Sequence, residues 1–134
     1  MQEGGCLCGK VRWQVEGEVG PAGICHCSDC RRVTGSAFNV SVRVPAARFR
    51  VTQGSPRAYT KAADSGRPIR RHFCADCGAP VWTDPPQHPD LVFIKSGSFD
   101  DPTLVQPVQQ AWLDSAVSWR DIPADLPGYR KGRT

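Results

Sequence analysis

Short runs of alternating apolar and polar residues dominate the chain and predict β-strands. The alternation is clearest at residues 11–15 and 38–44, where β-branched and aromatic side chains fall on one face. The apolar run at residues 91–94 predicts a strand buried on both faces. Less regular segments predict further strands at residues 21–26, 48–52, 57–61, 69–73, 80–83, 91–96 and 109–113.

Helix is expected to be scarce, because 13 glycines and 12 prolines are spread along the 134 residues and divide them into short segments. One helical turn is predicted at residues 29–33, with Ser28 as its N-cap and Gly35 at its end. Residues 122–134 contain prolines, glycines and basic residues, and they are predicted to lie over the surface or to fray.

The length and composition predict one globular domain over residues 1–134. Hydrophobic residues make up 40% of the chain and charged residues 22%, which is enough for a single core. The first residues lack a basic and apolar leader pattern, and no apolar stretch is long enough to cross a bilayer. We therefore expect a soluble, cytoplasmic protein with no membrane partner.

Seven cysteines form three local groups, which divide into four plus three thiols. Four thiolates close a zinc site, whereas three leave one coordination position open. An odd number of cysteines in a chain expected to be cytoplasmic disfavours a disulfide framework and favours metal binding. The groups are Cys6 with Cys8, Cys25 with Cys27 and Cys30, and Cys74 with Cys77.

The closed site is predicted from Cys74-x-x-Cys77 followed by Gly78, the form of a zinc knuckle. Cys6 and Cys8 can supply the second pair from the other end of a long loop. A metal that closes such a loop contributes to folding free energy, so a structural role is favoured over a reactive one.

The open site is predicted from Cys25, Cys27 and Cys30, three thiols within six residues. A thiol or water bound at an open coordination position of zinc has a lowered pKa and can ionise near neutral pH. The alternatives are a second structural site completed by a histidine or aspartate, or an iron-sulfur site. His26 is predicted to point away from the sulfurs and to pack or hydrogen-bond behind the site. His72 and His88 are expected to have surface or satisfied polar roles.

The formal net charge of +4 does not predict a nucleic-acid partner. Seven thiolates and two zinc ions would bring the loaded chain to about +1, so a general polyanion surface is not expected. Arg31-Arg32 and Arg70-Arg71 remain candidates for binding a small anion.

The cysteine groups and their neighbours resemble a known family. The matching segments are Gly5-Cys6-x-Cys8-Gly9, Cys25-His26-Cys27-x-x-Cys30-Arg31-Arg32 with Gly35 and Phe38, Phe73-Cys74-x-x-Cys77-Gly78, and residues 97–102. Over about residues 4–119 the chain resembles the glutathione-dependent formaldehyde-activating enzymes, also called centromere protein V-like proteins.

This resemblance implies an all-β fold of several short coiled antiparallel sheets stapled by zinc, of the β-tent type, with little helix. It implies two Zn²⁺ per chain. Cys6, Cys8, Cys74 and Cys77 would hold the structural ion, and Cys25, Cys27 and Cys30 would hold the catalytic one.

The implied activity is a carbon-sulfur lyase reaction that joins glutathione and formaldehyde, or a related aldehyde, as S-hydroxymethylglutathione. Arg31 and Arg32 would hold a glutathione carboxylate or balance the thiolate charge. Two positions depart from the family pattern: Gln110 replaces a histidine and Ser118 replaces a proline, so the chain lacks that titratable group.

Two other functions are compatible with the same residues. One is a non-catalytic zinc module that captures a thiol ligand or a protein partner. The other is a nucleic-acid-associated module, as in centromere protein V-like relatives, which the small net charge of the loaded chain disfavours.

Overall fold

The computed structural model describes residues 1–133, and these residues fold mainly as short strands. The all-β class is therefore confirmed. One α-helix, α1 (Ser28–Thr34), interrupts the strands, and five 3-10 turns connect them within the described range. The strands are β1 (Gln2–Gly5), β2 (Arg12–Val15), β3 (Ala22–Cys25), β4 (Asn39–Pro45), β5 (Phe49–Gln53), β6 (Arg57–Ala62), β7 (Pro68–Phe73), β8 (Pro80–Asp84), β9 (Leu91–Lys95) and β10 (Pro107–Ala111).

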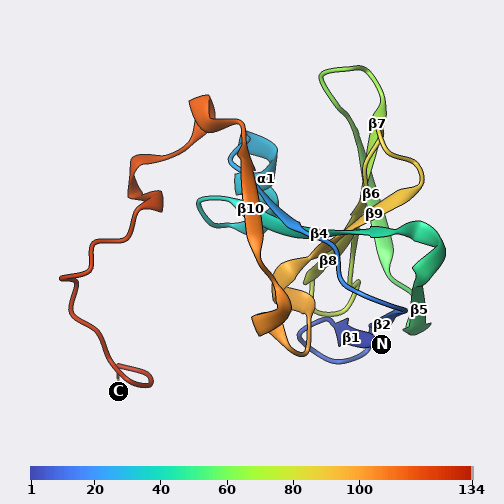
Figure 1. Ribbon diagram of the computed structural model, residues 1–134, viewed down its shortest axis with the longest axis horizontal. Helices are drawn as coiled ribbons and strands as arrows, with labels where there is room; N and C mark the ends of the chain where they lie inside the picture. The colour runs from blue at the N-terminus through green and yellow to red at the C-terminus, as the bar shows by residue number, and fades with distance from the viewer. Residues whose placement is uncertain (134) are drawn as a thin grey trace.

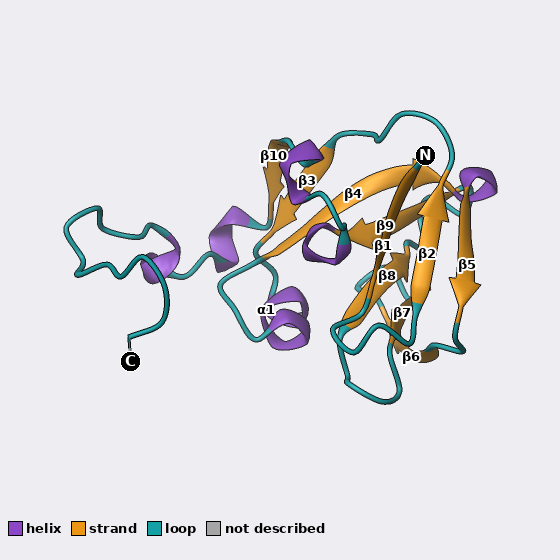
Figure 2. Cartoon of the chain, turned by 90° about the horizontal axis from the view of Figure 1, so that it is seen from below, coloured by secondary structure: helices purple, strands orange, loops and turns teal. Residues whose placement is uncertain are grey.

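The strands form two sheets (Figures 1 and 2). A three-stranded sheet has the order β1-β2-β5, and a seven-stranded sheet has the order β10-β3-β4-β9-β8-β7-β6. All neighbouring pairs of these named strands are antiparallel except β10 with β3, which is parallel. The parallel pair brings residues near the end of the domain beside the strand that carries Cys25.

The alternation in β4 separates the two faces of the large sheet. Val42 and Val44 are fully buried in the core shared with the small sheet. Ser41 and Arg43 lie on the opposite face and line a cavity. This arrangement explains why polar residues alternate with valines, since successive side chains of a strand point to opposite faces.

Trp13 of β2 is the centre of the core and is completely buried. Its ring meets Phe99 edge to face with 4.7 Å between the centroids, and its Nε1 donates to Oγ of Ser98 at 3.2 Å. A side chain added at Gly4 would collide with the Trp13 ring and with the Ser98 carbonyl. Glycine at position 4 therefore lets β1 lie directly against this tryptophan.

Two sequence predictions need correction. The N-cap of α1 is Cys27 rather than Ser28, because Cys27 Sγ accepts from the backbone N–H of Cys30 at 3.3 Å. The strand at residues 91–94 is not buried on both faces: Val92 and Ile94 are buried, whereas Phe93 lines the cavity and is only partly buried. Gly35 ends the helix at φ 67°, as predicted.

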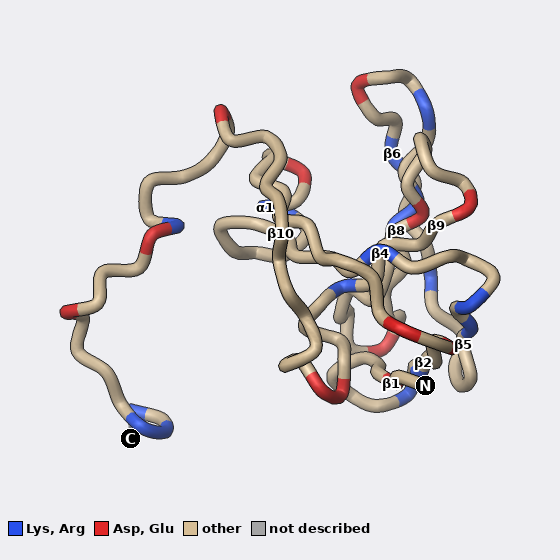
Figure 3. Tube along the Cα trace, in the orientation of Figure 1, with Lys and Arg blue, Asp and Glu red and all other residues tan. Residues whose placement is uncertain are grey.

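The chain leaves the sheets after β10 and extends away from them (Figure 1). Residues 121–133 are exposed, in agreement with the prediction for the tail. Basic and acidic positions are interspersed along the chain (Figure 3). No helix among residues 1–133 is long and apolar enough to cross a membrane.

Candidate functional site

Four cysteines meet at the boundary between the two sheets. Cys6 and Cys8 lie in the turn between β1 and β2, and Cys74 and Cys77 lie in the turn between β7 and β8. All four Sγ atoms lie within 4.8 Å of one another. The predicted closed group is thus assembled in space from residues that are far apart in sequence.

The sulfur spacing fits a metal ion. Sγ of Cys8 lies 3.6 Å from Sγ of Cys6 and 3.8 Å from Sγ of Cys74, and all are free thiols. A disulfide bond needs about 2.05 Å between sulfurs. A tetrahedral ion with Zn–S bonds of about 2.3 Å places its sulfurs about 3.8 Å apart. The donor set and its spacing therefore suit Zn²⁺.

Backbone hydrogen bonds shape both turns around this group. The N–H of Val11 donates to Sγ of Cys6 at 3.3 Å, and the N–H of Gly78 donates to the carbonyl of Cys74 at 2.8 Å. Gly78 has φ 75°, a conformation that glycine adopts without strain. The two turns are consequently held independently of any ion.

Three more cysteines gather where β3 meets α1. Cys25 is the last residue of β3, Cys27 caps the helix, and Cys30 lies in its first turn. Their Sγ atoms also lie within 4.8 Å of one another, and no histidine or carboxylate of the described residues joins the group. The predicted trio is therefore assembled, and its chemistry suits a metal that keeps one position open.

The thiols of the trio influence one another strongly. The hydrogen bond from Cys30 lowers the pKa of Cys25 to about 5. The same contact with Cys25, followed by burial, raises the pKa of Cys30 far above that of an ordinary thiol. The lowered pKa of Cys25 favours its thiolate, which is the form of cysteine that binds a metal ion.

His26 lies behind the trio, as predicted. It is 1% exposed, and its Nε2–H donates to Oε1 of Gln110 at 2.8 Å. Its ring meets Phe38 edge to face with 5.5 Å between the centroids. Nδ1 of His26 has no hydrogen-bond partner within residues 1–133. His72 has a satisfied polar role, with Nε2 2.7 Å from Oδ2 of Asp84.

A cavity of about 590 Å³ opens beside the trio on the polar face of the large sheet. Its lining includes all three cysteines and four basic side chains, together with two acidic ones. The basic residues are Arg43, Lys61, Arg71 and Lys95, and the acidic ones are Asp29 and Asp64. Before the thiols are counted, the basic side chains of the lining thus outnumber the acidic ones by two.

Lys95 is the most buried of these cations, with 8% exposure. Its Nζ donates to Oδ1 of Asn39 at 2.7 Å, and Asn39 Nδ2 donates to Oγ of Ser41 at 2.9 Å. Burial lowers the pKa of Lys95 below that of an exposed lysine. An ammonium group is thus held rigidly on the cavity wall.

Sequence reasoning missed the roles of Lys95 and Arg43 in lining this cavity. The sequence signal for such a role was a basic residue within a run of apolar strand residues, as Lys95 is in β9 and Arg43 is in β4. Arg31 and Arg32 were expected to hold a glutathione carboxylate or to balance the thiolate charge, and they are not among the residues that line the cavity. They lie in the last turn of α1, where Arg31 is partly buried and Arg32 is exposed.

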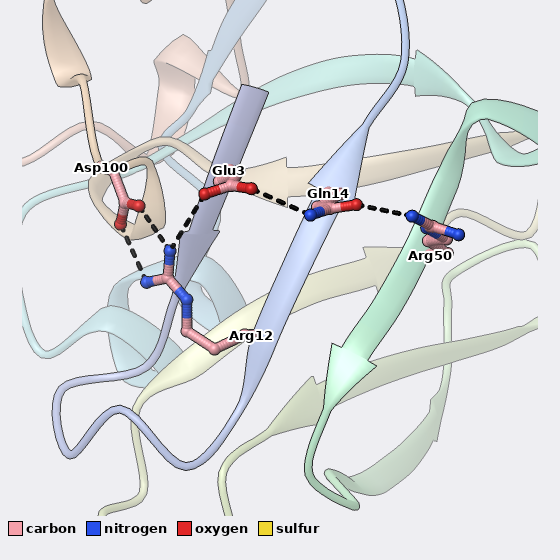
Figure 4. Close-up of polar contacts among 5 residues, drawn as sticks. All are labelled: Glu3, Arg12, Gln14, Arg50 and Asp100. Atoms are coloured by element: carbon pink, nitrogen blue, oxygen red, sulfur yellow. Dashed lines mark hydrogen bonds and ion pairs between the residues drawn. The ribbon is translucent and has the colours of Figure 1, made fainter. Parts of the chain in front are cut away.

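A second cavity of about 680 Å³ borders Cys6 but none of the trio. Arg12 and Asp100 stand on its wall and form a forked ion pair, with Nη1 of Arg12 2.9 Å from Oδ1 of Asp100. Figure 4 shows these contacts continuing through Glu3 and Gln14 to Arg50 across the small sheet. These contacts tie the segment after β9 to the sheet beside the closed cysteine group.

Comparison with known proteins identifies the family. Residues 1–115 match the family model described as glutathione-dependent formaldehyde-activating enzyme. The chain belongs to this family. An Emericella nidulans protein, provisionally named as a glutathione-dependent formaldehyde-activating enzyme, is 27% identical over 132 residues. That match covers 94% of this chain and 66% of the relative, so the chain spans slightly less than two thirds of the relative's length.

A solved structure supports the fold. The crystal structure of a Rhodobacter sphaeroides protein superposes with a TM-score of 0.63 and 21% sequence identity. The superposition covers 81% of this chain and 98% of the other. The strand-rich fold of this chain is therefore shared with a protein of divergent sequence.

Proposed function

We propose that this protein joins glutathione and formaldehyde, or a related small aldehyde, to form S-hydroxymethylglutathione. The observation that carries the proposal is the trio of free cysteines at one end of a 590 Å³ basic cavity, in a chain of this family. A cavity of this size accommodates a peptide-sized thiol. The reaction belongs to the carbon-sulfur lyases.

The two cysteine groups would divide the metal roles. Cys6, Cys8, Cys74 and Cys77 would hold a structural Zn²⁺, because four sulfurs close its coordination. Cys25, Cys27 and Cys30 would hold a second Zn²⁺ and leave its fourth position towards the cavity. When bound there, this ion would supply Lewis acidity that lowers the pKa of the substrate thiol.

The reaction balances without an oxidant or reductant. The substrate sulfur forms a bond to the aldehyde carbon as the carbon-oxygen π bond breaks. The thiol proton ends on the new hydroxyl oxygen, so the product contains all atoms of both substrates. Negative charge develops on that oxygen before it is protonated.

Lys95 would stabilise this negative charge. Its ammonium lines the cavity, is nearly excluded from water, and is held in place by Asn39. A preorganised donor in such a site interacts more strongly with the developing oxyanion than with the neutral aldehyde. Lys95 is therefore the proposed catalytic residue among the cavity cations.

The test is exchange NMR of glutathione and formaldehyde with zinc-loaded protein against the uncatalysed reaction. The wild type should raise the rate of S-hydroxymethylglutathione formation, Cys27→Ser should abolish the increase, and Ser36→Ala, outside the cavity lining, should retain it. Equal rates with and without the wild type would overturn the proposal. Glutathione binding in calorimetry without turnover would instead support the non-catalytic thiol-capturing module.

A further inference from the structure

Arg43 is a partly exposed cation of the cavity lining. Its guanidinium forms no ion pair with a carboxylate of the described residues. Its Cζ lies 5.2 Å from the centroid of the Phe93 ring, which supports it from below. Lys61 and Arg71 both pair with Asp29, at 2.6 and 3.9 Å. Among the ion pairs of residues 1–133, none includes Arg43.

Arg43 reaches across the sheet towards Gly23 of β3. A Cβ built on Gly23 would lie 3.6 Å from Nη2 of Arg43 and 3.6 Å from Nε2 of Gln109. Glycine thus leaves a space that a side chain would fill, and two nitrogen donors border it. A guanidinium and an amide N–H that converge on one space are suited to a carboxylate.

The spacing of residues along β3 separates this space from the cysteine trio. Gly23 and Cys25 lie two residues apart on β3, and both line the cavity. The Cα atoms of residues two apart on a strand are separated by about 7 Å. A ligand with its sulfur at the trio would therefore reach the donors with a carboxylate several bonds from that sulfur.

We propose that Arg43 and Gln109 form a carboxylate-binding subsite above Gly23, which selects thiols that carry a carboxylate several bonds from the sulfur. Peptide thiols such as glutathione belong to this class, whereas small neutral thiols do not. The inference rests on the proposed function for the position of the sulfur. It assigns carboxylate recognition to Arg43 instead of Arg31 or Arg32.

The test is calorimetry with zinc-loaded protein and three thiols: glutathione, its diethyl ester and 2-mercaptoethanol. Wild type should bind glutathione at least ~10-fold more tightly than the diester, as expected for a charge-assisted hydrogen bond. Arg43→Gln should remove that preference and leave 2-mercaptoethanol binding within about twofold. Arg57→Gln, on an exposed strand, is the matched control and should behave as wild type.

A steric variant tests the same subsite without removing charge. Gly23→Val should weaken glutathione binding and spare 2-mercaptoethanol, while Gly97→Val, at a position with open space, should change neither. Thermal unfolding of each variant confirms that it is folded. The comparison of glutathione with its diester uses only the wild type, so it tests the subsite even where a variant fails to fold.

The outcomes separate this inference from the proposed function. Turnover without any preference for glutathione over its diester would overturn the subsite and retain the function. A preference lost in Arg32→Gln but kept in Arg43→Gln would also overturn it. Carboxylate-dependent binding without turnover would support the subsite and overturn the reaction, and a failure of wild type to bind any thiol would overturn both.

Discussion

Gln110 accepts a hydrogen bond from His26 at 2.8 Å, on the side of β3 that faces away from the cavity. Its neighbours Gln109 and Ala111 line the cavity, whereas Gln110 does not. The family histidine that Gln110 replaces would therefore sit behind the cysteine trio if it kept this backbone position. The departure at residue 110 thus changes how the trio is supported rather than which groups face the substrate.

Replacing Gln110 should weaken the fold around the trio. Gln110→Leu removes the acceptor for His26 and leaves a buried imidazole N–H without a partner, at a cost of about 1–3 kcal/mol. Urea unfolding measures the change. Gln109→Leu, on the same strand and exposed, should cost less than about 0.5 kcal/mol. Equal losses in the two variants would show that the hydrogen bond to His26 does not support the fold.

The two cysteine groups should lose metal independently. Wild type is expected to carry two zinc ions per chain, and Cys77→Ser and Cys25→Ser should each retain one. Because Cys77 belongs to the group that joins the two sheets, its loss should lower the thermal midpoint by about 10 °C or more. Cys25→Ser should lower it by less than about 3 °C. Elemental analysis with thermal unfolding checks both, and a single zinc in the wild type would contradict the division.

Removing the Lys95 ammonium should slow the reaction more than it weakens substrate binding. Lys95→Met keeps an unbranched side chain without the charge and should lower kcat by about 10²-fold, the usual effect of losing an oxyanion donor. Glutathione affinity should change by less than about threefold, because the carboxylate lies at another part of the cavity. Steady-state kinetics and calorimetry separate the two. A loss of affinity with kcat unchanged would assign Lys95 to ground-state binding.

Lys95 also predicts a pH dependence of stability. Burial lowers its pKa in the folded protein, whereas the unfolded chain keeps a value of about 10.4. Between these two values the unfolded state binds more protons at Lys95, so the contribution of Lys95 to stability should rise with pH. Lys95→Met should lack this slope. Urea unfolding from pH 7 to 10.5 measures it, and parallel curves for the two proteins would contradict the assignment.

The forked pair between Arg12 and Asp100 should contribute modestly to stability. Both side chains are partly exposed, 31% and 53%, so solvent screens the interaction. A double-mutant cycle of Arg12→Gln and Asp100→Asn should give a coupling of about 0.5–1 kcal/mol that decreases with salt. Arg50→Gln with Asp100→Asn is the control and should show no coupling. A coupling that is unchanged in 1 M salt would contradict a screened ion pair.

The sequence predicted the cysteine trio because the spacing of its three residues is local. Cys25, Cys27 and Cys30 lie within one strand end and one helical turn, so neighbours in sequence remain neighbours in space. The alternation that predicted β4 also specified its buried valines. β1 was missed, since Gln2, Glu3 and two glycines show no apolar alternation.

The cavity could not be predicted in the same way. Its composition depends on which strands pair, and one neighbour of β4 is β9, which is distant from β4 in sequence. Arg43 and Gln109 meet above Gly23 only because β10 returns to lie parallel to β3. No local pattern encodes that return. Arg31 and Arg32 are adjacent to Cys30 in sequence, but they lie in the last turn of α1 and are not among the cavity-lining residues.

The two cysteine groups also differ in when they can form during synthesis. The trio spans residues 25 to 30 and needs only a short segment of emerged chain to bring its sulfurs together. The group of four requires residues 6 and 77, so it cannot form until most of the large sheet has been made. A nascent chain can thus present the thiols of the trio to cellular metal before it can complete the group of four that joins its two sheets.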